Sequence, residues 1–109
     1  MNLKDYREQA LQFAEYEEEL YPMVALAEET GEFLGIFAKA LRGDDLQKRF
    51  GTEEALREAV LKEAGDVLWQ LTNALNEAGL TIEEAAELNI KKLTDRKNRG
   101  VIRGSGDSR

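Results

Sequence analysis

The amino-acid sequence contains neither cysteine nor histidine. Without cysteine the chain has no disulfides, no thiolate metal ligands and no thiol nucleophile, which favours an intracellular, cytoplasmic protein. Without histidine it has no Ser-His-Asp triad, no His-ligated zinc and no histidine acid–base chemistry. A metal ion bound by this chain would therefore have oxygen ligands only.

Long apolar runs and a secretory leader are also missing from the sequence. No apolar stretch approaches the roughly 20 residues that span a bilayer, and the first residues lack the basic, apolar and small-residue order of a signal peptide. We therefore expect no association with a membrane. A length of 109 residues is typical of a single domain.

Acidic side chains outnumber basic ones, 22 to 15, and the net charge is −7. This balance argues against a nucleic-acid polymer as partner, because binding to such a polymer depends on neutralising its phosphates. The distribution is uneven: residues 91–109 hold seven basic and two acidic side chains, a local charge of +5 that leaves −12 for residues 1–90. The basic end either complements a helix C-terminus or binds an anionic ligand.

Proline occurs once, at Pro22, and segments with apolar residues three and four positions apart follow one another between glycines. This spacing predicts an all-α fold, a four-helix bundle-like domain with antiparallel helices over residues 1–99. Thr52 and Thr81 are typical N-cap residues, and Gly79 is a typical helix stop. The expected helices cover residues 3–20, 22–41, 52–78 and 81–97, with a one-turn segment at 46–50 and a glycine-rich basic tail at 100–109.

Two pairs of carboxylates stand out on the second and third long helices. Glu29 and Glu32 form one pair, Glu63 and Asp66 the other, and the step of three residues brings each pair to one helix face. Both pairs lie beside apolar core positions, where full solvation of a charge is not expected. Four converging like charges repel strongly unless a cation binds them.

With oxygen ligands only, the expected ion is hard: Mg²⁺, or Mn²⁺ as a substitute, held by carboxylates, water and substrate phosphates. The alternative is that these glutamates are ordinary solvated faces of a Glu-rich sequence. That alternative leads to a different function, a non-catalytic acidic helical interaction module that oligomerises or docks a partner helix.

Three segments carry a resemblance to a known family. They read Glu28-Glu29-Thr30-Gly31-Glu32, then Glu63-Ala64-Gly65-Asp66, then Asn89-Ile90-Lys91-Lys92-Leu93-Thr94-Asp95-Arg96. In this order they resemble the MazG-like all-α nucleoside triphosphate pyrophosphohydrolases, relatives of the dimeric dUTPases and the phosphoribosyl-ATP pyrophosphohydrolases. The resemblance covers roughly residues 20–100.

The resemblance implies Mg²⁺-dependent hydrolysis of a nucleoside triphosphate between the α- and β-phosphates. Four residues would then hold the metal: Glu29, Glu32, Glu63 and Asp66. Glu28 would orient or deprotonate the attacking water. It also implies a homo-oligomer, a dimer or a dimer of dimers. A phosphoribosyl-ATP-type or dUTP-type substrate is the alternative within the same chemistry.

The remaining site residues would contact the nucleotide itself. Lys92 and Arg96 lie one turn apart in the basic end and are expected to bind the substrate phosphates. Asn89 and Lys39 are expected as further phosphate contacts. Trp69 and Asn73 are expected to contact the base or the sugar.

Overall fold

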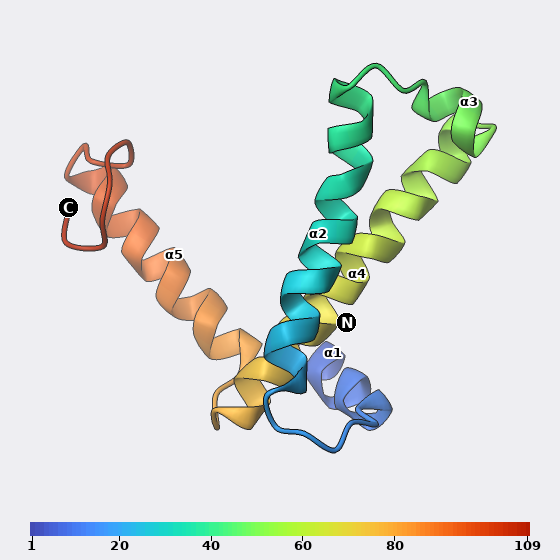
Figure 1. The fold of residues 1–109 in the computed structure, drawn as a ribbon. Helices are drawn as coiled ribbons and strands as arrows, with labels where there is room; N and C mark the ends of the chain where they lie inside the picture. The colour runs from blue at the N-terminus through green and yellow to red at the C-terminus, as the bar shows by residue number, and fades with distance from the viewer.

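The computed structural model describes all 109 residues and contains helices and no strands, which confirms the predicted all-α class (Figure 1). The elements in chain order are α1 (Leu3–Ala10), the 3-10 turn η1 (Leu11–Phe13), α2 (Tyr21–Leu41), α3 (Leu46–Phe50), α4 (Glu53–Glu77) and α5 (Ile82–Asn98). No helix combines the length and the apolar character that crossing a membrane requires.

The predicted helix boundaries after residue 50 are confirmed by their caps. The Thr52 hydroxyl accepts the backbone N–H of Ala55 at 3.1 Å, and the Thr81 hydroxyl accepts that of Glu84 at 3.2 Å. Each bond satisfies an N–H group that has no partner within the helix. Gly79 follows α4 with φ +74°, a left-handed conformation that glycine adopts without a steric penalty.

The first helix is shorter than predicted. We expected one helix over residues 3–20, and that prediction is wrong beyond η1. Ala14 is extended, with ψ 104°, and a loop leads from there to α2. Four glutamates crowd residues 15–19, where a continuing helix would place their like charges together. The indole N–H of Trp69 donates to the carbonyl oxygen of Ala10 at 3.1 Å, so a tertiary contact holds the end of α1.

The main packing interaction joins α2 and α4, which run antiparallel and are connected through α3 (Figure 1). Buried apolar residues are few: Ala10, Pro22, Ala25, Ile36 and Ile82. The radius of gyration is 17.0 Å, whereas a compact domain of this length has about 13 Å. The isolated chain is therefore open, and most of its apolar side chains retain exposed surface.

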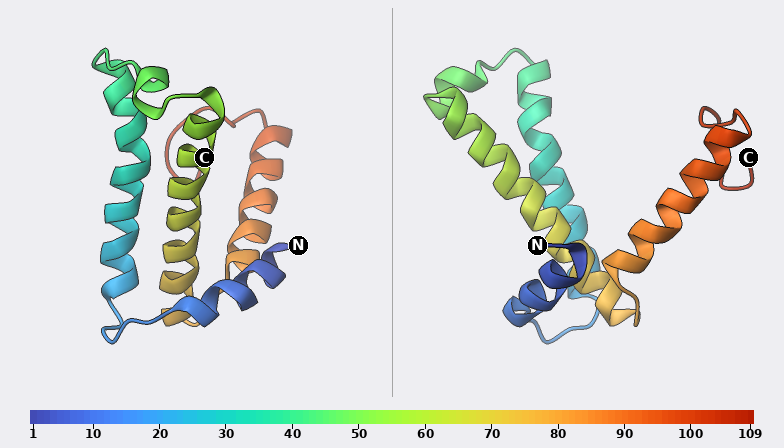
Figure 2. Two further views of the ribbon diagram at one scale, coloured as in Figure 1. Left: turned by 90° about the vertical axis from the view of Figure 1, so that its right-hand side faces the viewer. Right: turned by 180° about the vertical axis from the view of Figure 1, so that it is seen from behind.

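The openness comes from α5, which leaves the junction with α4 and diverges from the α2–α4 pair (Figure 2). A bidentate ion pair near its start holds it to α1: the Arg7 guanidinium donates to both carboxylate oxygens of Glu83 at 2.9 Å. One chain therefore does not close a four-helix bundle. The closed four-helix bundle stays a prediction.

Candidate metal centre and nucleotide site

A cluster of three carboxylates lies where α2 faces α4. Glu29 and Glu32 come from one face of α2 and Glu63 from α4, and one oxygen from each lies within 4.8 Å of the others. The three-residue step aligns the first two side chains, and the antiparallel pairing of the helices brings the third. We call Glu29, Glu32 and Glu63 the carboxylate cluster.

The electrostatics of the carboxylate cluster favour a bound cation. The Oε2 atoms of Glu29 and Glu63 are buried and accept no hydrogen bond. Burial, followed by the charges of Glu32 and Asp66, raises the pKa of both carboxyl groups. No ion pair of the chain neutralises the cluster. Buried, unpartnered carboxylate oxygens fit a hard divalent cation such as Mg²⁺ or Mn²⁺.

Two further predicted residues flank the carboxylate cluster. Asp66 lies one turn beyond Glu63 on α4, and its charge contributes to the raised pKa of Glu29 and Glu63. It also lines a hollow of about 510 Å³ together with Tyr6, whose pKa is raised by burial and then by this carboxylate. Glu28 is exposed on α2 directly before Glu29. Sequence reasoning did not single out Tyr6.

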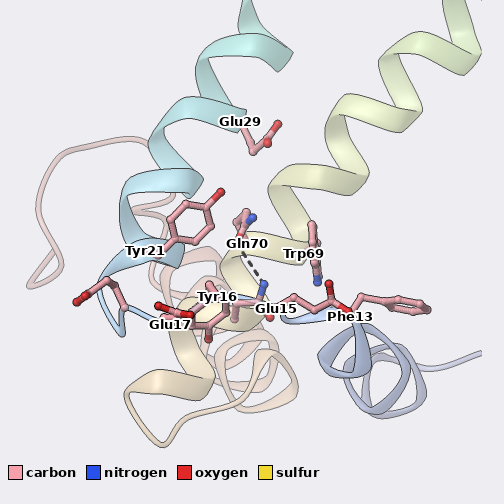
Figure 3. Close-up of a pocket in the computed structure, with 10 residues that line it drawn as sticks. Phe13, Glu15, Tyr16, Glu17, Tyr21, Glu29, Trp69 and Gln70 are labelled. Atoms are coloured by element: carbon pink, nitrogen blue, oxygen red, sulfur yellow. Dashed lines mark hydrogen bonds between the residues drawn. The ribbon is translucent and has the colours of Figure 1, made fainter.

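One side of the carboxylate cluster opens into an aromatic pocket of about 520 Å³ (Figure 3). Its lining includes Glu29 together with Tyr16, Tyr21, Trp69, Gln70 and Asn73. The predicted base and sugar residues, Trp69 and Asn73, therefore lie in the same pocket. Asn73 is 1% exposed; its Nδ2 donates to Gln70 at 3.2 Å, while its Oδ1 has no hydrogen-bond partner. The wall of the pocket thus combines an aromatic ring with a buried amide whose oxygen has no partner.

The carboxylate cluster also borders a second cavity, of about 570 Å³, which we call the α2–α3 groove. Glu28, Glu32 and Glu63 line it, and so do two cations, Lys39 and Arg49. Lys39 was a predicted phosphate contact. Arg49 was missed, although the basic last turn of α3 was a visible signal.

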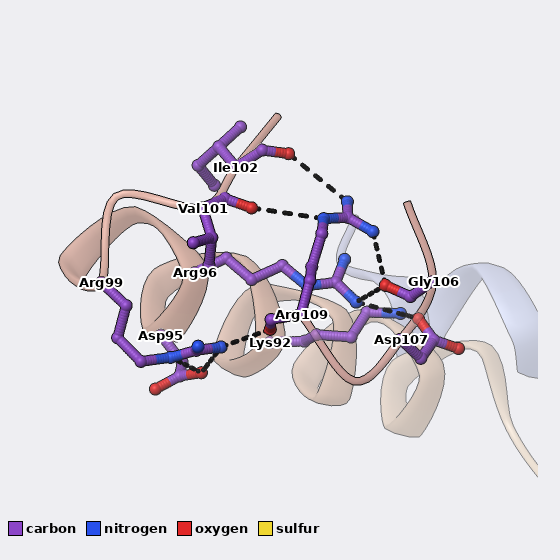
Figure 4. A network of polar contacts seen from close by, with 9 residues as sticks. All are labelled: Lys92, Asp95, Arg96, Arg99, Val101, Ile102, Gly106, Asp107 and Arg109. Carbon is purple, nitrogen blue, oxygen red and sulfur yellow. Dashed lines mark hydrogen bonds and ion pairs between the residues drawn. The ribbon is translucent and has the colours of Figure 1, made fainter. Parts of the chain in front are cut away.

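The other predicted phosphate contacts are on α5 and are not brought to the carboxylate cluster within one chain. Lys92 Nζ lies 3.0 Å and an Arg96 guanidinium nitrogen 2.9 Å from the same oxygen of Asp107, in the C-terminal tail (Figure 4). Hydrogen bonds from these two side chains lower the pKa of the Asp107 carboxyl. Asn89 and Lys92 line a separate hollow beside Asp107. The tail thus places a carboxylate where an anionic ligand of α5 would bind.

Comparison with known proteins is consistent with this arrangement. Residues 17–101 match the family model described as the MazG nucleotide pyrophosphohydrolase domain. The chain therefore belongs to the MazG nucleotide pyrophosphohydrolase domain family, as the resemblance predicted. It is also 36% identical over 89 residues to the Gene 37 protein of Mycobacterium phage L5. The aligned region covers 82% of this chain and 75% of that protein. No solved structure matches the chain.

Proposed function

We propose that the protein is a Mg²⁺-dependent nucleoside triphosphate pyrophosphohydrolase that cleaves an NTP or dNTP into the nucleoside monophosphate and pyrophosphate. One observation supports this most directly: the carboxylate cluster has buried, unpartnered oxygens and lies between two cavities in a chain of the MazG family. An acidic interaction module has no need for carboxylates buried without a partner, because such groups destabilise a protein that binds no cation.

In this proposal the carboxylates divide into metal ligands and a base. The ligands are Glu29, Glu32, Glu63 and Asp66. A divalent ion bound there supplies charge neutralisation at the phosphates and lowers the pKa of a bound water. Glu28 is exposed next to the cluster and is placed to orient the attacking water or to accept its proton. The water attacks the α-phosphorus, the α–β bridging oxygen leaves with the pyrophosphate, and the proton passes to Glu28.

The nucleoside occupies the aromatic pocket in this proposal. The Trp69 ring is held in position by its N–H bond to the Ala10 carbonyl, which leaves the ring free to stack on base or ribose. The Oδ1 of Asn73 is buried without a partner, and in this proposal it becomes accessible when the nucleotide binds and accepts a hydrogen bond from the base or sugar. The two residues then position the α-phosphate at Glu29, which lines the same pocket.

A second copy of the chain is part of the proposal. Large apolar side chains remain exposed on three helices, for example Val24 (69%) on α2, Leu61 (67%) on α4 and Leu88 (67%) on α5. Such faces favour association. Lys92, Arg96 and Asn89 then reach the phosphates from a partner subunit after Asp107 is displaced. Light scattering should give a multiple of the chain mass of 12.3 kDa at micromolar concentration, and a monomer mass would contradict the assembly.

The deciding experiment is a panel of NTPs and dNTPs incubated with Mg²⁺ or Mn²⁺, in which pyrophosphate and orthophosphate are measured separately. We expect pyrophosphate and the monophosphate in equal amounts, and no turnover in excess EDTA. Release of orthophosphate alone, or full turnover in EDTA, would contradict the proposal. The panel also identifies the preferred base and sugar, including the dUTP-type alternative, and phosphoribosyl-ATP can be added as a further substrate.

A further inference from the structure

We infer that the α2–α3 groove binds the β- and γ-phosphates of the substrate and then the leaving pyrophosphate, with Arg49 and Lys39 as the cations that hold them. This inference rests on the proposed function and adds a residue, Arg49, that lies between the two carboxylate motifs. Three observations support it: the position of the groove, the lack of ion-pair partners for its two cations, and the open space along α2.

The position of the groove matches the polarity of a nucleoside triphosphate. Glu29 lines the aromatic pocket, whereas Glu32 and Glu63 line the groove, and all three carboxylates belong to one cluster within 4.8 Å. A ligand with its nucleoside in the aromatic pocket and its α-phosphate at the cluster therefore has its remaining phosphates in the groove. The bond between the α- and β-phosphates then lies next to the carboxylate cluster.

The two cations of the groove are not neutralised by the protein. Neither Lys39 nor Arg49 forms an ion pair, and neither side chain donates a hydrogen bond. Their acidic neighbours in the groove, Glu28, Glu32 and Glu63, belong to the proposed metal and water site. Arg49 projects from α3, whose N-terminus is capped by the Asp45 carboxylate at 3.1 Å from the Lys48 N–H. Unpaired cations beside a metal centre are what a pyrophosphate group requires.

The groove wall on α2 is open. Gly31 and Gly35 are one turn apart on this wall, and a Cβ atom added to either would meet no other atom within 4 Å. Neither glycine has a positive φ, so the backbone conformation does not require glycine. Glycine inside a helix costs about 0.5–1 kcal/mol relative to alanine. The absence of other atoms beside these two positions leaves space for a ligand close to the helix backbone.

The test uses inorganic pyrophosphate as the probe, with the full-length protein in its Mn²⁺-loaded form. Arg49→Ala and Lys39→Ala should each weaken pyrophosphate inhibition and raise KM for the triphosphate by roughly 10- to 100-fold, the range for a lost charge-assisted hydrogen bond. Arg49→Lys should recover part of the loss. Lys48→Ala is the matched control, because Lys48 is exposed on the same short helix and does not line the groove.

Mn²⁺ affinity separates this inference from the proposed function. We expect the Arg49 and Lys39 variants to bind Mn²⁺ as the wild type does. If the wild type hydrolyses no triphosphate, the proposed function fails. If the wild type is active and both variants keep wild-type KM and wild-type inhibition by pyrophosphate, only the assignment of the groove is overturned.

Gly35→Leu supplies a second variant that leaves the charges unchanged. Leucine is a better helix former than glycine, so helix content should be retained, while its side chain fills the groove. We expect pyrophosphate inhibition to be lost and Mn²⁺ binding to persist. Unchanged pyrophosphate inhibition with an altered oligomeric mass would assign the glycine to a helix contact and overturn the inference.

Discussion

We propose that two pairs of cations hold phosphates, and the pairs differ in whether a carboxylate of the protein neutralises them. Lys92 and Arg96 on α5 share the carboxylate of Asp107, and the Arg96 side chain is only 5% exposed. Lys39 and Arg49 lie in the α2–α3 groove and form no ion pair. The α5 pair belongs to a motif of the family resemblance, whereas Arg49 lies in the segment between motifs. The sequence prediction therefore included the α5 pair, which the protein itself neutralises, and Lys39, but it missed Arg49.

This difference indicates how the two pairs respond to substrate. Cations already paired with a carboxylate exchange one anion for another when phosphate binds, so the net gain is small. Unpaired cations gain a new partner. The groove pair should therefore contribute more to the affinity of a free subunit than the α5 pair, and the following experiments test that ordering.

The largest effect is expected from substitution of two proposed metal ligands, because catalysis depends on them whichever cation pair holds the phosphates. Glu63→Gln and Asp66→Asn should reduce kcat by roughly 1,000-fold or more, because several kcal/mol of transition-state charge stabilisation are lost with the metal. Helix content should stay intact and the metal-free Tm should be equal or higher, because removing a charge from the acidic site relieves repulsion. Steady-state kinetics and circular dichroism measure both, with Glu87→Gln on the exposed face of α5 as control. A large loss of helix in both variants would show that these residues are structural.

The second effect concerns metal binding itself. At a Mg²⁺ or Mn²⁺ concentration 100 times Kd, mass action adds about 2.7 kcal/mol to the free energy of unfolding. For a domain of this size that corresponds to a rise in Tm of roughly 10–20 °C. Thermal melts of the wild type should show this rise, and melts of Glu63→Gln should not. An unchanged wild-type Tm would favour the interaction module.

The third effect concerns the α5 pair and is compared with the roughly 10- to 100-fold effects expected for Arg49→Ala and Lys39→Ala in the groove. If they hold phosphates, Lys92→Ala and Arg96→Ala should lower kcat/KM by roughly 2- to 10-fold, a loss of about 0.5–1.5 kcal/mol, because phosphate replaces an existing ion pair, with Mn²⁺ binding to the free enzyme nearly unchanged. Asp107→Ala should act in the opposite direction and raise kcat/KM, because it removes the competing carboxylate. Kinetics and urea unfolding on all three variants provide the measurement. Wild-type kinetics with a stability loss below about 1 kcal/mol would assign the α5 pair to the helix terminus and tail.

The smallest effect is the pH dependence of the contact that holds α5 to α1. Hydrogen bonds from Arg7 lower the pKa of Glu83 from 4.5 to about 2. A lowered carboxyl pKa stabilises the folded state above the unfolded pKa, and this contribution is lost as pH falls from about 4.5 through about 2. The difference in Tm between wild type and Glu83→Gln should therefore be constant above pH 5 and shrink on acidification. A difference that does not change with pH would indicate that the ion pair does not stabilise the fold.

Much of the secondary structure was predictable because it depends on local interactions. The caps at Thr52 and Thr81 and the stop at Gly79 follow from backbone groups within one turn. The first helix was predicted too long, because its apolar spacing continues past residue 13. Its end depends on the bond between Trp69 and the Ala10 carbonyl, residues 59 positions apart in the chain. No local pattern reports a contact of that kind.

The sequence by itself determined which type of metal ligand the chain can supply: the absence of histidine and cysteine leaves oxygen ligands, and the three-residue steps align Glu29 with Glu32 and Glu63 with Asp66. Only the tertiary structure decided which cations accompany them. The short helix α3, which connects the antiparallel α2 and α4, places Arg49 in the same groove as Glu63, and the divergence of α5 leaves Arg96 with Asp107. Helix periodicity acts over one or two turns, whereas the direction in which a helix leaves its neighbour depends on packing between distant segments.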